Sequence, residues 1–140
     1  MTSFNLDDFL PYQLAAAAER VSADFAVTYR AQFGLSIPEW RILAHLSQND
    51  ALSVRDLHQR AGLEKSKASR AAARLEASGL VEKKAGSVDK RLIELTLTAE
   101  GTAALTKLIP IARAFEDDII ASLTDQEQSA LRSALQKLRR

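Results

Sequence analysis

Short polar and basic side chains are concentrated in one stretch of the chain. They are Lys65, Ser66, Lys67, Ser69, Arg70 and Arg74. The surrounding segment 63–77 is helical by composition, and positions 66, 70 and 74 share one helix face, with 67 beside them. An α-helix fits the major groove of B-DNA, where short polar side chains approach base edges and arginine binds guanine or phosphate. The pattern predicts a DNA-recognition helix; the alternative is an amphipathic surface helix with solvated charges.

The opposite side of this helix is small and apolar and is predicted to face the core. Its members are Ala68, Ala71, Ala72 and Leu75. A shorter helix precedes it in "SVRDLHQRAG", where Ser53 is placed to cap, Asp56 lies in the first turn and Gly62 can take the left-handed conformation at the end. Glu64 then occupies the N-cap position of the basic helix, and Gly79 closes that helix. Two short helices joined by a tight turn indicate a helix-turn-helix.

A charged hairpin tip follows the basic helix. The segments "LVEKKA" and "RLIELTL" flank "GSVDK", and Ile93, Leu95 and Leu97 alternate with polar residues as a strand with one buried face should. Such a hairpin can project toward the adjacent minor groove, where Lys90 or Arg91 would meet a negative potential. Asp89 can pair with Arg91 and fix the direction of the guanidinium, or it can simply start the turn. The predicted fold class is therefore mainly α with a small β-hairpin wing, a winged helix-turn-helix.

Long helices are predicted on both sides of this lobe. The first follows Pro11, is rich in alanine and ends at Gly34. Ser36 and Glu39 are spaced as a capping box at the start of the next helix, in which each side chain bonds a backbone donor of the other. After the hairpin, the sequence predicts a helix capped by Thr98, with Pro110 inside it, and then a helix begun by a Thr124 and Glu127 capping box. Apolar stripes run along both long helices, at Leu14, Ala18, Val21, Phe25 and Thr28 and at Leu108, Ala112, Phe115 and Ile119.

Charge is distributed unevenly along the 140 residues, although the net charge is only +1. Residues 1–52 carry −3, residues 53–94 carry +4 and residues 95–140 are neutral. A local basic excess in a nearly neutral chain is expected where one face meets a polyanion. The length suits one domain with its own core.

Several classes of function are disfavoured by composition. The chain has no cysteine, which excludes disulfides, thiolate metal sites and thiol-based redox sensing. No phosphate-binding glycine loop or nucleophile and base pair is present, so an enzyme is not expected. His45 and His58 are the only histidines and lack partners at ligand spacing, so neither a metal nor another cofactor is expected. No apolar run approaches the roughly 20 residues of a membrane span, and the amino terminus lacks a basic signal segment, so a soluble, cytoplasmic protein is expected.

The sequence resembles the MarR family of transcriptional regulators over nearly its whole length. The resemblance is carried by "LSIPEWRILAHL", by "SVRDLHQRAGLEKSKASRAAARLEASGLVEKK" and above all by "DKRLIELTLTAEG", which contains the Asp-x-Arg wing and the Leu-Thr-x-x-Gly start of the next helix. Glu64 departs from the commoner capping serine or aspartate.

The resemblance implies a homodimer whose terminal helices, 1–34 and 98–140, intertwine around a DNA-binding lobe at 35–97. It implies binding to a pseudo-palindromic operator of double-stranded DNA. By position, Ser66, Ser69, Arg70 and Arg74 would meet the major groove and Arg91 the minor groove, with Asp89 orienting it. Many members are repressors released by small phenolic or aromatic acids, so a similar effector is expected here.

An effector pocket is predicted where the terminal helices join the lobe. Its candidate residues are Tyr29, Phe33, Trp40, Arg41 and His45. An arginine beside aromatic rings can hold a carboxylate, although Trp40 is also a natural core residue. The alternative for the whole chain is a winged-helix module that binds protein instead of DNA, which would not need the basic helix.

Overall fold

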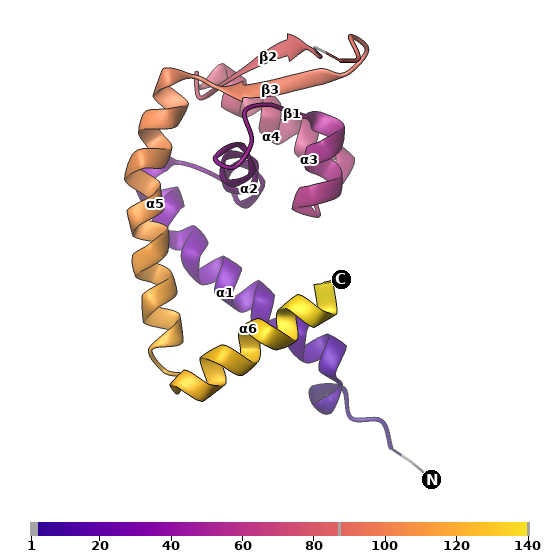
Figure 1. Cartoon of the computed structure of the whole chain (residues 1–140), viewed down its shortest axis with the longest axis vertical. Coiled ribbons are helices and arrows are strands. Elements are labelled where there is room, and N and C mark those ends of the chain that lie inside the picture. Colours follow the sequence, from indigo (N-terminus) through magenta and orange to yellow (C-terminus); the bar gives the residue numbers. More distant parts are fainter. Residues whose placement is uncertain (1–2, 87, 140) are drawn as a thin grey trace. The chain divides into compact units, whose positions relative to one another are not determined.

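The computed structural model describes residues 3–86 and 88–139 of the chain, which is mainly helical with a small antiparallel sheet (Figure 1). The elements form two compact units, Met1–Thr106 and Lys107–Arg140. The predicted mainly α winged helix-turn-helix class is confirmed. No helix among the described residues is long and apolar enough to cross a membrane.

The first long helix, α1, spans Leu10–Phe33 and follows a 3₁₀ turn at Leu6–Asp8. Pro11 lies in its first turn, where a missing backbone donor costs nothing. Gly34 ends the helix in the left-handed conformation, with φ of 66°, and donates its N–H to the Arg30 carbonyl. The predicted helix and its glycine stop are therefore confirmed.

The second helix, α2, spans Ile37–Leu46 and is capped by Ser36. The Glu39 backbone N–H donates to Ser36 Oγ over 3.3 Å, as expected. The reciprocal half of the predicted capping box is wrong. The Glu39 carboxylate accepts from the Ser36 hydroxyl over 2.8 Å, and it also faces Arg74 from the recognition helix.

The helix-turn-helix consists of α3, Val54–Ala61, and α4, Lys65–Ala77. Ser53 and Asp56 form a complete capping box at the start of α3, with donor to acceptor distances of 2.9 and 3.4 Å. Gly62 ends α3 with φ of 65°, as predicted. Glu64 is the N-cap residue of α4 but bonds no backbone donor there.

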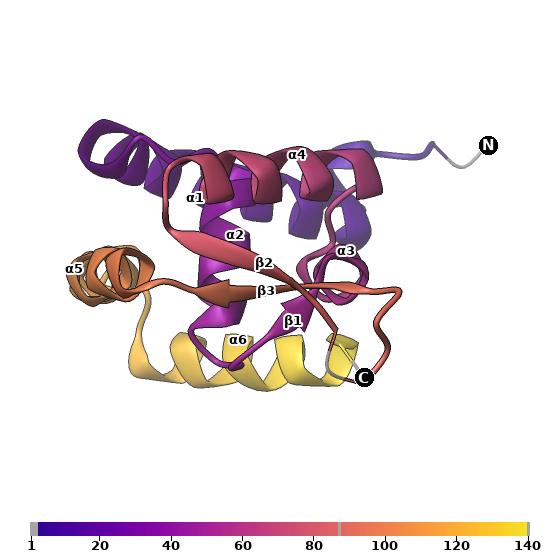
Figure 2. The same cartoon turned by 90° about the horizontal axis from the view of Figure 1, so that it is seen from above.

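The hairpin consists of β2, Val81–Ala85, and β3, Ile93–Leu97, paired so that Val81 faces Leu97 and Ala85 faces Ile93. A short strand that was not predicted, β1 at Leu52–Ser53, pairs with the other edge of β3 (Figure 2). The order β1-β3-β2 ties the helix-turn-helix to the wing through backbone hydrogen bonds.

Burial along β3 differs from the expected alternation. Leu95 is fully buried, whereas Ile93 is 52% exposed. Ile93 pairs with Ala85 at the tip end of the hairpin, beyond the part of the sheet that β1 extends. The sheet lies against α2, α3 and α4 (Figure 1).

The start of α5, Ala99–Ile120, lies directly against the turn between α4 and β2. The Thr98 hydroxyl donates to the Gly79 carbonyl over 2.6 Å and accepts from the Gly101 N–H over 2.9 Å, which confirms Thr98 as the cap. A Cβ on Gly101 would lie 2.0 Å from the Leu80 carbonyl oxygen. The Leu-Thr-x-x-Gly sequence thus places a cap and a residue without a side chain where helix and turn meet.

The last helix, α6, spans Asp125–Arg139. Its predicted capping box is confirmed, since Thr124 N donates to Glu127 Oε1 over 2.9 Å and Glu127 N donates to Thr124 Oγ1 over 3.1 Å. Pro110 lies inside α5, as expected.

We predict that Gly101→Ala destabilises the fold although alanine favours a helix, because its Cβ would collide with the backbone of Leu80. The free energy of unfolding should fall by about 1–3 kcal/mol, as for an overpacked core. Chemical denaturation at fixed protein concentration measures it. Ala103→Gly, at an exposed site in the same helix, is the control and should cost only about 1 kcal/mol of helix propensity. A Gly101→Ala variant more stable than wild type would contradict the close approach.

Candidate nucleic-acid interface

The two faces of α4 differ as the sequence predicts. Its outer face carries the polar and basic set, all exposed: Lys65, Ser66, Lys67, Ser69, Arg70 and Arg74. Its inner face is buried, with exposures of 0% for Ala68, 1% for Ala71, 0% for Ala72 and 0% for Leu75. Packing against α2 and α3 therefore commits the basic face of the helix to solvent.

Carboxylates contact two residues of the outer face. Ser66 Oγ donates to Glu64 Oε1 over 3.2 Å, so Glu64 binds a side chain of the first turn in place of a backbone donor. Near the other end, Arg74 Nη1 lies 3.9 Å from Glu39 Oε1. Neither contact was predicted from the sequence.

The hairpin tip holds Arg91 in a fork. Its Nε donates to Asp89 Oδ1 over 3.1 Å and its Nη2 donates to Oδ2 over 3.2 Å, while its backbone N–H donates to Oδ1 over 3.0 Å. These hydrogen bonds lower the pKa of the Asp89 carboxyl below its ordinary value. Asp89 therefore has both of the roles that the sequence offered as alternatives: it shapes the turn and it pairs with Arg91. The Arg91 side chain is 90% exposed despite this contact.

Backbone geometry also fixes the wing. Gly86 N donates to the Leu92 carbonyl over 2.8 Å, and Leu92 N donates to the Asp89 carbonyl over 3.1 Å. A Cβ on Gly86 would lie 2.3 Å from the Asp89 carbonyl oxygen, so the turn needs glycine there. Lys90 is exposed at the same tip.

A cavity of about 640 Å³ lies between α3, α4 and the hairpin. Lys65 and Ser69 of the recognition helix line it together with Arg91 of the wing. Arg55 and Lys83 also line it, and sequence reasoning missed both. They belong to the basic segment 53–94, but neither lies on the predicted helix face or at the hairpin tip. The cavity brings together cations from three elements, as a surface that binds a polyanion requires.

The candidate effector residues separate into two places. Tyr29 and Trp40 pack against each other with ring centroids 5.9 Å apart, and both contact Phe25 edge to face. Burial raises the pKa of the Tyr29 phenol, while the charges of Arg30 and Arg41 act in the opposite direction, which places Arg41 near this cluster. Arg41 and His45 are half-buried on α2.

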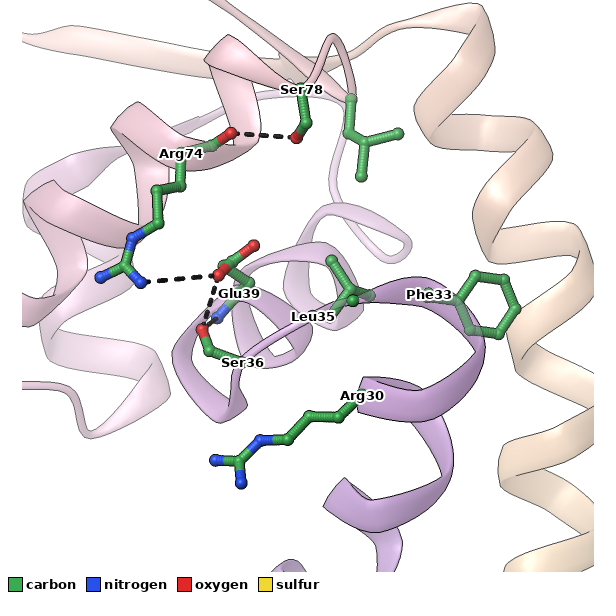
Figure 3. Close-up of a pocket in the computed structure, with 9 residues that line it drawn as sticks. Arg30, Phe33, Leu35, Ser36, Glu39, Arg74 and Ser78 are labelled. Atoms are coloured by element: carbon green, nitrogen blue, oxygen red, sulfur yellow. Dashed lines mark hydrogen bonds and ion pairs between the residues drawn. The ribbon is translucent and has the colours of Figure 1, made fainter.

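Phe33 lies elsewhere, in a cavity of about 760 Å³ formed by the end of α1, the start of α2 and the end of α4 (Figure 3). Arg30, Glu39 and Arg74 also line that cavity. Among residues 3–86 and 88–139, no group of three or more histidine, aspartate or glutamate side chains could hold a metal ion.

Comparisons with known proteins agree with this geometry. A family model described as the MarR family matches residues 33–92. An HTH-type transcriptional repressor of Mycobacterium tuberculosis is 31% identical over 105 residues, which cover 75% of this chain and 76% of the relative. These relatives are transcriptional regulators, so the expectation that the chain is not an enzyme is confirmed.

Solved structures share the fold over nearly the whole chain. A MarR family regulator from Silicibacter pomeroyi DSS-3 has a TM-score of 0.80 and 35% identity, with 97% of this chain and 99% of that one covered. BpsR of Bordetella bronchiseptica has a TM-score of 0.85 at 22% identity, covering 99% of this chain and 98% of that one, which shows the fold alone. The identities of 31% and 35% over most of the chain, together with the family match at residues 33–92, show that it belongs to the MarR family of DNA-binding transcriptional regulators.

Proposed function

We propose that this regulator is a homodimeric, sequence-specific repressor that binds a pseudo-palindromic operator and is released by a small aromatic or phenolic acid. The observation that carries the proposal is the shared surface of α4 and the wing, where Lys65, Ser69 and Arg91 line one cavity. A helix in the major groove and a wing beside it need their contacts on one side of the lobe. The M. tuberculosis relative is named a repressor, which supports the direction of regulation.

On α4, the short and the long side chains suit different parts of the DNA. Ser66 and Ser69 lie in the first half of the helix and are short enough to bring the helix close to base edges. Arg70 and Arg74 follow on the same exposed face and can bind guanine or phosphate. Lys65 and Lys67 begin the helix and suit phosphate contacts.

The wing suits the minor groove because its arginine is held before DNA arrives. The Asp89 fork restricts the Arg91 side chain, so binding loses less side-chain entropy. Lys90 adds a second cation at the tip. The Asp89 carboxylate partly offsets the charge of Arg91. The pair therefore orients the guanidinium more than it adds to the general attraction between the wing and DNA phosphates.

Apolar side chains on the terminal segments support a dimer. Leu131, Leu135 and Leu138 of α6 are 45%, 41% and 57% exposed, and Phe4, Phe9 and Leu10 are 71%, 45% and 57% exposed. Leu131, Leu135 and Leu138 recur on one face of α6, and a contiguous exposed apolar face is typical of a protein interface. We assign segments 1–34 and 98–140 to dimerisation and 35–97 to DNA binding.

A two-fold dimer would place its recognition helices in half-sites about one turn, roughly 34 to 36 Å, apart. Such a regulator acts in the cytoplasm, where the chromosome lies.

Of the five candidate residues, the effector proposal keeps Tyr29, Trp40, Arg41 and His45 as one group, whereas Phe33 would belong to the separate cavity at the end of α1. Tyr29 and Trp40 would form a packed aromatic wall, and Arg41 supplies a cation beside it that suits a carboxylate. BpsR, which shares the fold, has its DNA binding regulated by 6-hydroxynicotinic acid, an aromatic acid.

The proposal predicts enrichment of a roughly two-fold symmetric site when the wild-type protein selects duplexes from fragmented genomic DNA. The Arg70→Ala, Arg91→Ala double variant is the control and should enrich none. Affinity for the selected site should fall about 10³- to 10⁵-fold between about 50 and 200 mM salt if six to ten phosphates are engaged. No enrichment by wild type, or a flat salt response, would instead favour a protein-binding module.

The Asp89 fork predicts how its carboxyl titrates. Because the Arg91 hydrogen bonds lower the Asp89 pKa, Arg91→Ala should return that pKa toward the ordinary aspartate range. The ion pair is therefore present at neutral pH and lost as pH falls through the lowered pKa. Carboxyl NMR across an acid titration measures it, with Lys90→Ala as the control. An Asp89 titration that Arg91→Ala leaves unchanged would contradict preorientation of the wing arginine.

For the dimer, Leu135→Glu should weaken self-association by at least roughly tenfold, because it places a charge in an apolar interface. Sedimentation velocity over a concentration series measures this change. Gln136→Glu, at the neighbouring exposed position of α6, adds the same charge and should leave the dimer intact. A monomeric wild type, or equal behaviour of the two variants, would refute the assignment of α6.

A further inference from the structure

One buried carboxylate of the scaffold faces an arginine of the recognition helix. Glu39, in the first turn of α2, is 7% exposed, and its Oε1 lies 3.9 Å from Arg74 Nη1 and 2.8 Å from Ser36 Oγ. Figure 3 shows the Arg74 side chain reaching from α4 toward Glu39 at the start of α2. Arg74 itself remains 61% exposed.

This contact distinguishes Arg74 from the other cations of the helix. Among the described residues, Lys65, Lys67 and Arg70 form no ion pair, so their charges attract any DNA sequence. Arg74 and Glu39 together are neutral. Arg74 therefore adds little to the sequence-independent attraction that phosphates exert on a basic face.

The carboxylate is also a rigid anchor. The Ser36 hydroxyl binds Glu39 Oε1, and Ser36 Oγ in turn accepts the Glu39 N–H over 3.3 Å, so the side chain is fixed to the cap of its own helix. At 3.9 Å the contact is an ion pair and not a hydrogen bond, so the five N–H donors of the Arg74 guanidinium stay available. A guanidinium drawn toward Glu39 by charge alone can still bind a guanine or a phosphate.

We infer that Glu39 is a positioning residue for DNA recognition, which acts through Arg74. It offsets the charge of this arginine and draws its guanidinium toward α2, so that Arg74 contributes more to discrimination between sequences than to non-specific binding. The inference rests on the proposed function, because it requires α4 to bind specific DNA.

The test uses Glu39→Gln, which keeps one oxygen to accept from the Ser36 hydroxyl and removes the negative charge. Affinity is measured for the duplex that wild type selects from a random library and for a scrambled duplex of equal length and composition. Glu39→Gln should bind the scrambled duplex more tightly, with a salt slope steeper by about one phosphate contact, and lower the ratio of the two affinities roughly tenfold.

Glu116→Gln is the matched control, since Glu116 forms an ion pair of similar length, 3.7 Å, with Arg132, and both residues lie outside the DNA-binding lobe. It removes the same charge and should preserve the affinity ratio. In an Arg74→Ala background, Glu39→Gln should have no further effect on that ratio, because Glu39 acts through Arg74. An unchanged ratio in Glu39→Gln, or an equal loss in the Arg74→Ala background, would overturn the inference.

If thermal unfolding shows that Glu39→Gln does not fold, Arg74→Lys carries the test, because its side chain is largely exposed. Lysine keeps the charge but lacks the planar fork, so non-specific binding should stay and the ratio should fall roughly tenfold. A preserved ratio would overturn the inference. A wild-type protein that does not discriminate between the two duplexes would refute the proposed function. Discrimination that survives these substitutions would refute only the role of Glu39.

Discussion

Three alanines on the inner face of α4 set how closely the recognition helix approaches α2 and α3. Ala68, Ala71 and Ala72 are at most 1% exposed, and a larger side chain at any of them would force the helices apart. Because the helix is held by this face, its opposite face is committed to solvent with its serines, lysines and arginines. Orientation of the DNA-binding groups thus follows from core packing before any DNA is present.

The wing is positioned by a second constraint, the close backbone contacts between the turn after α4 and the start of α5. Leu80 N donates to the Leu75 carbonyl, so the turn out of α4 leads directly into β2. The Leu80 carbonyl then accepts from Thr98 N and lies so close to Gly101 that no side chain fits between them. Since β3 pairs with β1 ahead of α3 as well as with β2, both edges of β3 are hydrogen-bonded. Lys65, Ser69 and Arg91 line one cavity as a result.

Local signals made most elements predictable from the sequence. Caps at Ser53, Thr98 and Thr124 and the glycine stops at Gly34 and Gly62 depend on residues only a few positions apart, and the structure has them where the sequence places them. The inner and outer faces of α4 follow from helical spacing in the same way.

Features that depend on tertiary neighbours could not be predicted. The strand β1 is only two residues long and forms because β3 offers a free edge, a length at which no alternation is visible. Glu39 matched a capping box by spacing, but it faces an arginine 35 positions later in the chain, and no local pattern records that contact. Arg55 and Lys83 join the candidate site only because the sheet brings the hairpin beside α3.

Chemical probing of the protein–DNA complex shows whether α4 and the wing contact adjacent grooves of one DNA site. Dimethyl sulfate modifies guanine N7 in the major groove and adenine N3 in the minor groove. On the selected duplex, the wild-type protein should protect guanines in two major-groove segments about one helical turn apart, with flanking protected adenines. Arg91→Ala should abolish the adenine protection and retain the guanine protection. Adenine protection that persists in Arg91→Ala, or guanines left unprotected by wild type, would contradict the account.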